Sequence, residues 1–167
     1  MSAFPPWTWA IPERFNIGVA CTDAHLGTPL AGRVAVVVDD DARGVREATF
    51  AELAATTDRF AACLRELGVG VGERVLIRLP NCLEYPTVFL GAMKCGVIPV
   101  PTSTLLTAEE VLYVAADSGA VAMVTDRPTW NAMHGKLEKD TPLAHVLLLE
   151  LAVHRVPGGP KIGRAHV

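Results

Sequence analysis

Three glycines in the stretch LGVGVGERVLIRLP, residues 67–80, occupy the alternate positions Gly68, Gly70 and Gly72 and could line a loop that binds phosphate. Such a loop follows a strand and precedes a helix, because the free N–H groups at the helix N-terminus then face the anion. Here a helical pattern precedes the glycines and a strand-like run follows them, without a Gly-Lys-Ser/Thr triplet. We therefore expect the glycines to end a helix and turn the chain into a strand.

Other chemically active residue types lack the spacing that their chemistry needs. Ser118 lies in ADSGA rather than in the G-x-S-x-G pattern of a hydrolase nucleophile, and the five histidines have no metal-ligand spacing. The acidic run 39–41 directly follows a strand-like segment, where a solvated turn is commoner than a metal site. The cysteines share no C-x-x-C pair, which favours reduced core thiols over metal or redox sites; they are Cys21, Cys63, Cys82 and Cys95. We expect neither a catalytic residue nor a metal site in this chain.

A hydroxyl-rich segment, TSTLLT at Thr102 to Thr107, is the strongest remaining candidate for ligand binding. It follows the strand-like run VIPVP, and α/β folds place their ligands at the carboxyl ends of strands. Thr107 and Glu110 also have the spacing of a capping box, so helix capping explains part of the hydroxyl content. The residues alone predict an α/β domain without a visible active site.

The elements that would position this segment alternate between strand-like and helical patterns. Strand-like runs occupy 33–40, 73–80, 97–101, 120–126 and 145–153, and helical patterns occupy 15–25, 49–68, 81–96, 108–119 and 128–139. This order predicts a mainly parallel sheet flanked by helices. The valine-rich run 33–40 predicts a strand that is buried on both faces. Pro99 and Pro101 predict an edge strand that pairs on one side only.

Helix ends carry recognisable signals. Capping-box spacing predicts helix starts at Thr49 and Asn81 as well as at Thr107, and a glycine follows the helices that end before 68, 96 and 119. Pro86 would delete a hydrogen bond past the first turn, which favours either an irregular start after Asn81 or a helix that begins nearer Tyr85.

Composition limits the classes of function. The 167 residues are 50% hydrophobic and 20% charged, as in one soluble globular domain, and the net charge of −3 without a basic run argues against a nucleic-acid partner. No apolar stretch approaches the roughly 20 residues of a membrane-spanning helix. The N-terminus has no signal-peptide pattern, so we expect a cytoplasmic protein.

Three segments, at 7–25, 48–101 and 102–126, carry motifs of a known family. TFAEL matches a T-Y-x-E-L element, and LGAMKCGVIPVP matches an L-x-A-x-x-A-G-x-x-x-V-P element with Cys95 where alanine is frequent. With these motifs the chain, over about residues 7–150, resembles the start of the acyl-CoA synthetases, which are AMP-forming adenylating enzymes like firefly luciferase and peptide-synthetase adenylation domains. PERFNIGV is most like short- and medium-chain acyl-CoA synthetases, whereas VPTSTLLTAEE is also similar to benzoate-type aryl-CoA ligases. The resemblance therefore does not determine which carboxylic acid is the substrate.

The resemblance implies an incomplete N-terminal subdomain of an α/β adenylating enzyme. Such a ligase uses ATP and Mg²⁺ to convert a small carboxylic acid to an acyl-adenylate, and then transfers the acyl group to coenzyme A with release of AMP. The family's phosphate loop, magnesium glutamate, ribose aspartate and catalytic lysine would all lie beyond residue 150. We therefore expect the chain alone to be inactive, to bind none of these cofactors, and to pack against the missing remainder of the same protein.

In this family the segment Thr102–Thr107 lies near the coenzyme A entrance, where some relatives place an arginine for the coenzyme's phosphates. This chain has Thr104 or Leu105 at that place. The resemblance thus implies coenzyme A entrance candidates at Thr102, Ser103 and Thr104, without the arginine contact.

We expect three regions: an irregular arm at 1–14, a partial AMP-binding domain at 15–152, and an unassigned tail at 153–167. The final IGRAHV resembles a translated sequencing adapter, and PGGPKIG lacks the hydroxyl series of a phosphate loop. Two other functions stay open for the chain. One is a stand-alone α/β module that binds a nucleotide or acyl ligand without catalysis, and the other is a noncatalytic interaction protein.

Overall fold

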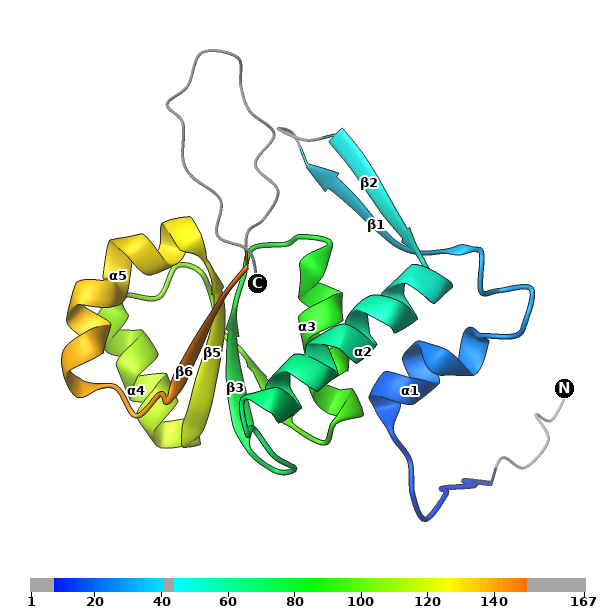
Figure 1. Ribbon diagram of the computed structural model, residues 1–167, viewed down its shortest axis with the longest axis horizontal. Coiled ribbons are helices and arrows are strands. Elements are labelled where there is room, and N and C mark those ends of the chain that lie inside the picture. The colour runs from blue at the N-terminus through cyan, green and yellow to red at the C-terminus, as the bar shows by residue number, and fades with distance from the viewer. Residues whose placement is uncertain (1–7, 41–43, 150–167) are drawn as a thin grey trace, which may run out of the picture.

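The computed structural model describes residues 8–40 and 44–149 (Figure 1). The predicted arm at 1–14 is thus described from residue 8 onward. The predicted tail at 153–167, with its PGGPKIG stretch, lies outside the described residues.

A four-stranded parallel sheet with the order β4-β3-β5-β6 organises the fold. Its strands are β3 (Arg74–Arg78), β4 (Ile98–Pro101), β5 (Ala120–Asp126) and β6 (His145–Leu149). From β3 the chain passes first to β4 on one side and then to β5 on the other, so the strand order changes direction at β3. The carboxyl ends of β3 and β5 therefore form a topological switch point, the place where open α/β sheets bind their ligands.

Helices cover both faces of this sheet, as predicted (Figure 1). They are α2 (Phe50–Glu66), α3 (Glu84–Lys94), α4 (Ala108–Ser118) and α5 (Arg127–Asp140). Successive residues of β3 point to opposite faces. Val75 and Ile77 are fully buried in a core with α2 and α3, whereas Leu76 is fully buried in a second core with α4 and α5. Because both faces are covered, the strands read as continuous apolar runs.

The valine-rich run at 33–40 lies outside this sheet, and its prediction was wrong. It forms β1 (Val34–Asp40), which pairs only with β2 (Gly44–Thr49) in a two-stranded antiparallel hairpin beside the helices (Figure 1). Val37 and Val45 on this hairpin are 57% and 62% exposed, so β1 is not buried on both faces. The polar sequence of β2, GVREAT, gave no strand signal of its own.

Local capping signals gave mixed results. Thr49 and Thr107 each form a complete capping box with the glutamate three residues later, which confirms those two helix starts. The capping box at Asn81 was wrong, and the alternative start nearer Tyr85 is confirmed, because α3 begins at Glu84 with Leu83 as an N-cap that makes no side-chain bond. That later start places Pro86 in the first turn, where a missing N–H costs nothing. Among the described strands, β4 pairs only with β3, as expected of an edge strand.

The helix predicted at 15–25 divides into α1 (Ile17–Cys21) and a short 3₁₀ helix, η1 (Asp23–His25). Lys94 of α3 fixes this segment, because its ammonium lies 2.5 Å from the Asp23 carboxylate and 2.8 Å from that of Asp58 on α2. Burial acts to raise the pKa of Asp23, but the Lys94 and Thr22 hydrogen bonds outweigh it and lower that pKa. The ion pairs therefore hold the N-terminal elements against α2 and α3.

Candidate functional site

The segment Thr102–Thr107, here called the 102–107 loop, leaves the carboxyl end of β4 and crosses the end of β3. Thr102 ties it down with two bonds to the Ile77 carbonyl: its N–H donates over 2.9 Å and its hydroxyl over 3.1 Å. At the other end, Thr107 donates its N–H to the Glu110 carboxylate over 2.7 Å. The Thr107 N–H and hydroxyl lower the pKa of that carboxyl group. The loop is therefore anchored to the sheet at its start and to α4 at its end.

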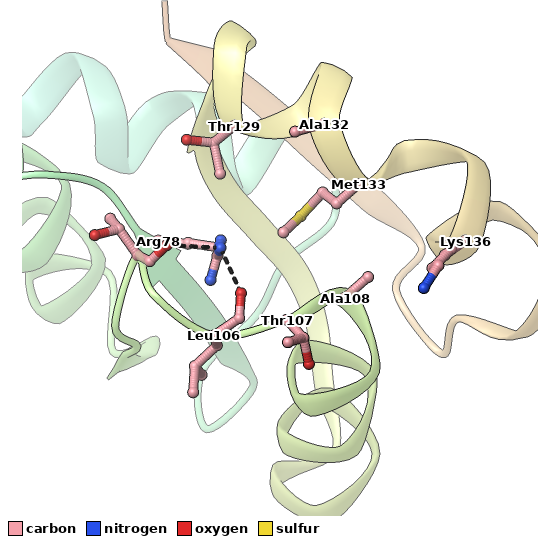
Figure 2. A pocket seen from close by; sticks show the side chains of 9 residues that line it. Arg78, Leu106, Thr107, Ala108, Thr129, Ala132, Met133 and Lys136 are labelled. Carbon is pink, nitrogen blue, oxygen red and sulfur yellow. Dashed lines mark hydrogen bonds between the residues drawn. The ribbon is translucent and has the colours of Figure 1, made fainter.

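Arg78, the last residue of β3, lies directly beneath this loop, and its side chain is on the α4 and α5 face of the sheet. Only 4% of Arg78 is exposed. Its Nη1 donates to the Ser103 carbonyl over 2.7 Å, and its Nη2 donates to the carbonyls of Thr104 over 2.9 Å and Leu106 over 2.7 Å. Figure 2 shows the guanidinium beside the Leu106 carbonyl. One side chain thus binds three carbonyls of a single turn.

Three carbonyl dipoles and the negative charge of Asp126 surround the guanidinium of Arg78. Burial lowers the pKa of its guanidinium from the ordinary value, and the charge of Asp126 at the end of β5 opposes that shift. The Asp126 carboxylate also caps α5, where it accepts the Thr129 N–H over 2.7 Å. Two buried polar atoms near these strand ends, Arg78 Nε and Thr125 Oγ1, have no hydrogen-bond partner among the described residues.

A cavity of about 340 Å³, here called the switch-point pocket, opens beside Arg78 at the carboxyl edge of the sheet (Figure 2). The first turns of α4 and α5 both border it, and helix N-termini favour negatively charged groups. Lys136 adds a cation, although Glu109 lies 3.5 Å from its ammonium. The lining residues are Arg78, Thr104, Leu106, Thr107, Ala108, Thr129, Ala132, Met133 and Lys136. The pocket can therefore receive an anionic group at its polar mouth.

The three predicted entrance residues take different places around this pocket. Thr104 lines it, whereas Thr102 is used to anchor the loop. The Ser103 hydroxyl accepts the Leu105 N–H over 3.1 Å and so shapes the turn. Leu105 is 90% exposed and does not line the pocket.

Sequence reasoning did not identify Arg78 or Lys136. The sequence did contain a signal for Arg78, which is the arginine within the apolar run VLIRLP. In a strand whose two faces are both covered, every side chain is buried on one face or the other, so an arginine in such a run is expected to be buried. Lys136 gave no comparable signal, because a lysine on a helix is ordinarily a solvated residue.

The alternating glycines lie at the opposite edge of the sheet from this pocket. Gly68 follows the C-terminus of α2 with a φ of 79°, and Gly72, with a φ of 82°, directly precedes the turn into β3. The prediction that they end a helix and turn into a strand is confirmed. Ser118 lies near that same edge, and its hydroxyl donates to the Val114 carbonyl of its own helix over 2.6 Å.

The remaining polar candidates form no further site within residues 8–40 and 44–149. In this part of the chain, no group of three or more His, Cys, Asp or Glu side chains could hold a metal ion. Asp39 lies within β1, paired opposite Val45. The four cysteines are all free, but Cys21 is exposed, so its prediction as a core thiol was wrong. No helix among the described residues is both long enough and apolar enough to cross a membrane.

Comparison with known proteins gives consistent matches. A protein family described as AMP-binding enzyme matches residues 23–160. Benzoate–CoA ligase of Thauera aromatica is 39% identical over 131 residues, which are 76% of this chain and 24% of that ligase. A long-chain-fatty-acid–CoA ligase of Mycobacterium tuberculosis is 37% identical over 81 residues, which are 48% of this chain and 16% of that ligase.

Among solved structures, a benzoate CoA ligase from Burkholderia xenovorans matches with a TM-score of 0.70 at 30% identity. The match covers 83% of this chain and 27% of that ligase. The chain therefore spans about a quarter or less of the length of these relatives.

Proposed function

The chain belongs to the AMP-binding enzyme family, and from this membership we propose that it is the N-terminal part of an acid–thiol ligase. The whole enzyme would convert a carboxylic acid and ATP to an acyl-adenylate and pyrophosphate, and would then form acyl-CoA and AMP. The observation that carries the proposal is the match over residues 23–160, together with relatives that are CoA ligases. A carboxylate needs such activation because it is a poor electrophile.

For the carboxylic acid substrate, we propose only its chemical class. A benzoate ligase and a long-chain fatty-acid ligase are both among the relatives, so an aromatic and an aliphatic acid are the two candidates to compare. We place the enzyme in the cytoplasm and assign it Mg²⁺ as the partner of ATP. The 167-residue chain by itself would be inactive and would bind none of these cofactors.

Coenzyme A would approach this chain at the switch-point pocket, where Thr104 lines the entrance and Thr102 and Ser103 hold the adjoining loop in place. Three features support this assignment: the position at the switch point of the sheet, the helix N-termini of α4 and α5, and the cation of Lys136. The coenzyme, when bound, supplies the thiol that accepts the acyl group. The residues of this chain would orient it and shield it from water.

The activity is tested by recovering the longer reading frame from the source DNA beyond the codon for Leu149 and expressing the full product. Acid-dependent exchange of pyrophosphate into ATP measures adenylation without coenzyme A, and release of AMP with coenzyme A measures the complete reaction. Exchange with benzoate or with a fatty acid would support the proposal and identify the class of acid. A folded full-length product that catalyses no exchange with either acid would contradict it.

The entrance is tested by enlarging one residue at its mouth. In the full-length enzyme, Thr104→Trp should raise the KM for coenzyme A about tenfold, because the indole would fill the pocket mouth, and should leave pyrophosphate exchange unchanged. Leu105→Trp is the matched control, since Leu105 points to solvent and does not line the pocket. Equal KM values for the two variants would place the entrance elsewhere.

A stand-alone binding module is the second candidate, because every lining residue of the switch-point pocket comes from the described part of this chain. Isothermal titration of the 167-residue chain with AMP or with coenzyme A measures it directly. Saturable binding would favour the module, whereas heats indistinguishable from dilution would favour a chain that needs the rest of the enzyme.

A further inference from the structure

We propose that Arg78 is a positioning residue that holds the 102–107 loop in the shape that the thiol donor requires at the switch-point pocket. Because the use of this pocket by coenzyme A is itself proposed, the inference rests on the proposed function. It assigns to Arg78 a role that differs from phosphate binding, although the side chain borders a pocket suited to an anion.

The hydrogen bonds of Arg78 determine this assignment. Both terminal nitrogens of the guanidinium already donate to carbonyls of one turn, at 2.7 to 2.9 Å, and the residue is almost completely buried. Arginine presents its donors in a rigid planar fork, so a guanidinium that holds three carbonyls cannot rotate toward a ligand without releasing them. The cation therefore acts on the loop and not directly on an incoming phosphate.

Because of the geometry of the peptide bond, the contact between Arg78 and the loop carbonyls also determines the direction of backbone N–H groups on the outer side of the loop. All described peptide bonds are trans, and in a trans peptide the carbonyl and the following N–H point in opposite directions. With the Ser103 and Thr104 carbonyls directed at Arg78, the N–H groups of Thr104 and Leu105 point away from it, and the Leu105 N–H donates to the Ser103 hydroxyl. The arginine thus fixes the orientation of these peptide groups, and with it the direction of the Thr104 N–H on the outer side of the loop.

A second arginine on the same strand provides a matched control. Arg74, at the amino end of β3, donates from Nε to the Ser118 carbonyl and from Nη2 to the Gly119 carbonyl, each over 2.7 Å. Like Arg78, Arg74 belongs to β3 and donates its guanidinium N–H groups to main-chain carbonyls, but it lies at the opposite edge of the sheet. Its loss should disturb the end of α4 without affecting the 102–107 loop.

Hydrogen exchange of the 167-residue chain, followed by mass spectrometry, tests the positioning directly. In Arg78→Met, peptides that cover the 102–107 loop should exchange about tenfold faster, because three carbonyl bonds are lost. Arg78→Lys keeps the charge beside Asp126 but cannot bridge three carbonyls, so it should give an intermediate increase. In Arg74→Met, the increase should appear around residues 117–120 instead.

Two outcomes of this experiment would overturn the positioning role. One is unchanged exchange of the 102–107 loop in a folded Arg78 variant. The other is a uniform increase over β3 and β5 in both Arg78→Met and Arg78→Lys, which would show a general loss of stability. If Arg78→Met does not fold, the exchange pattern of Arg78→Lys decides between a local and a general effect.

Kinetics of the full-length enzyme test whether the positioning of the loop by Arg78 affects the use of coenzyme A. Arg78→Met should raise the KM for coenzyme A about tenfold, with partial recovery in Arg78→Lys, while the rate of pyrophosphate exchange and the KM for ATP stay unchanged. Equal losses in exchange and in acyl transfer would contradict a role confined to the thiol donor. If the wild-type enzyme lacks exchange activity, the proposed function fails, whereas the hydrogen-exchange result still decides whether Arg78 positions the loop.

Discussion

Single arginines at the two ends of β3 show how this sheet tolerates charge. A buried ion is costly unless it is paired or hydrogen-bonded, and the buried Arg78 and the half-buried Arg74 both donate to main-chain carbonyls from their guanidinium groups. Arg74 binds the last carbonyls of α4, where a cation also favours the negative end of the helix dipole. Asp117 in the final turn of that helix opposes the dipole, and Arg74 offsets it. Each arginine therefore joins β3 to a segment distant in sequence.

Cysteine reactivity gives a prediction at the level of single residues. Burial, followed by the charge of Glu84, raises the pKa of the Cys82 thiol to about 11, whereas Cys21 is exposed. Since the thiolate is the reacting form, iodoacetamide at pH 8.5 should modify Cys21 about a hundredfold faster than Cys82. Peptide mass spectrometry over time measures both rates.

A labelling control in urea separates burial from intrinsic reactivity. Unfolding should bring the two cysteines to within a few-fold of each other, because the burial of Cys82 is then lost. If Cys82 in the native chain reacts as fast as Cys21, the packing around the start of α3 is not as described here.

At the scale of elements, predictions succeeded where the information was local. The capping boxes at Thr49 and Thr107 were predictable because the hydroxyl and the glutamate lie within one turn of each other. The hairpin was not predictable, since β2 has a polar sequence and depends on pairing with β1. For α3 the sequence left two alternatives, and the structure confirms the start near Tyr85 that Pro86 favoured over the capping box at Asn81.

Helix packing gives a prediction in which one substitution has opposite effects at two sites. A Cβ on Gly91 of α3 would lie 2.8 Å from the Thr57 carbonyl oxygen and 3.0 Å from Phe60 Cδ1, both on α2. Gly91→Ala should therefore destabilise the chain by about 1–3 kcal/mol, as overpacking does. A Cβ on Gly135 of α5 meets nothing within 4 Å, so Gly135→Ala should stabilise by about 0.5–1 kcal/mol through helix propensity.

Urea unfolding of the two variants beside the wild-type chain measures both changes in the free energy of unfolding. Opposite signs are the expected result, because both sites lie within helices and differ only in their surroundings. Stabilisation by Gly91→Ala would mean that α2 and α3 pack less closely than the described contacts require.

For the whole molecule, the alternation of strand and helix patterns was enough to predict a covered parallel sheet. The strand order was not predictable, because both neighbours of β3 are reached by crossovers whose direction the pattern does not record. The position of the switch-point pocket follows from that order, so the sequence indicated the 102–107 loop but not the arginine beneath it. The family resemblance added the coenzyme, which no residue pattern in this chain specifies.

Among the described residues, the N-terminal third carries most of the large hydrophobic side chains that are exposed. Ten of the fourteen large hydrophobic side chains that are exposed among the described residues lie between Trp9 and Val45. On the hairpin, the register places Val37 opposite Glu47 and Val45 opposite Asp39, so both valines belong to the same face. Arg46, on the other face, approaches Glu84 of α3. The valine face therefore points away from the helices and is not covered by the described part of the chain.

This surface predicts self-association of the isolated chain. In the absence of a partner, its valine face should bind the dye ANS and promote concentration-dependent association, as exposed apolar patches do. The double variant Val37→Thr with Val45→Thr keeps β-branched residues in the strands and should lower both signals, measured by dye fluorescence and analytical ultracentrifugation. Val71→Thr is the control, because Val71 is more exposed, at 84%, than either hairpin valine but lies in a turn distant from the hairpin in sequence. Similar reductions in both variants would show that association depends on general hydrophobicity, and a monomeric wild-type chain without dye binding would contradict an uncovered docking face on the hairpin.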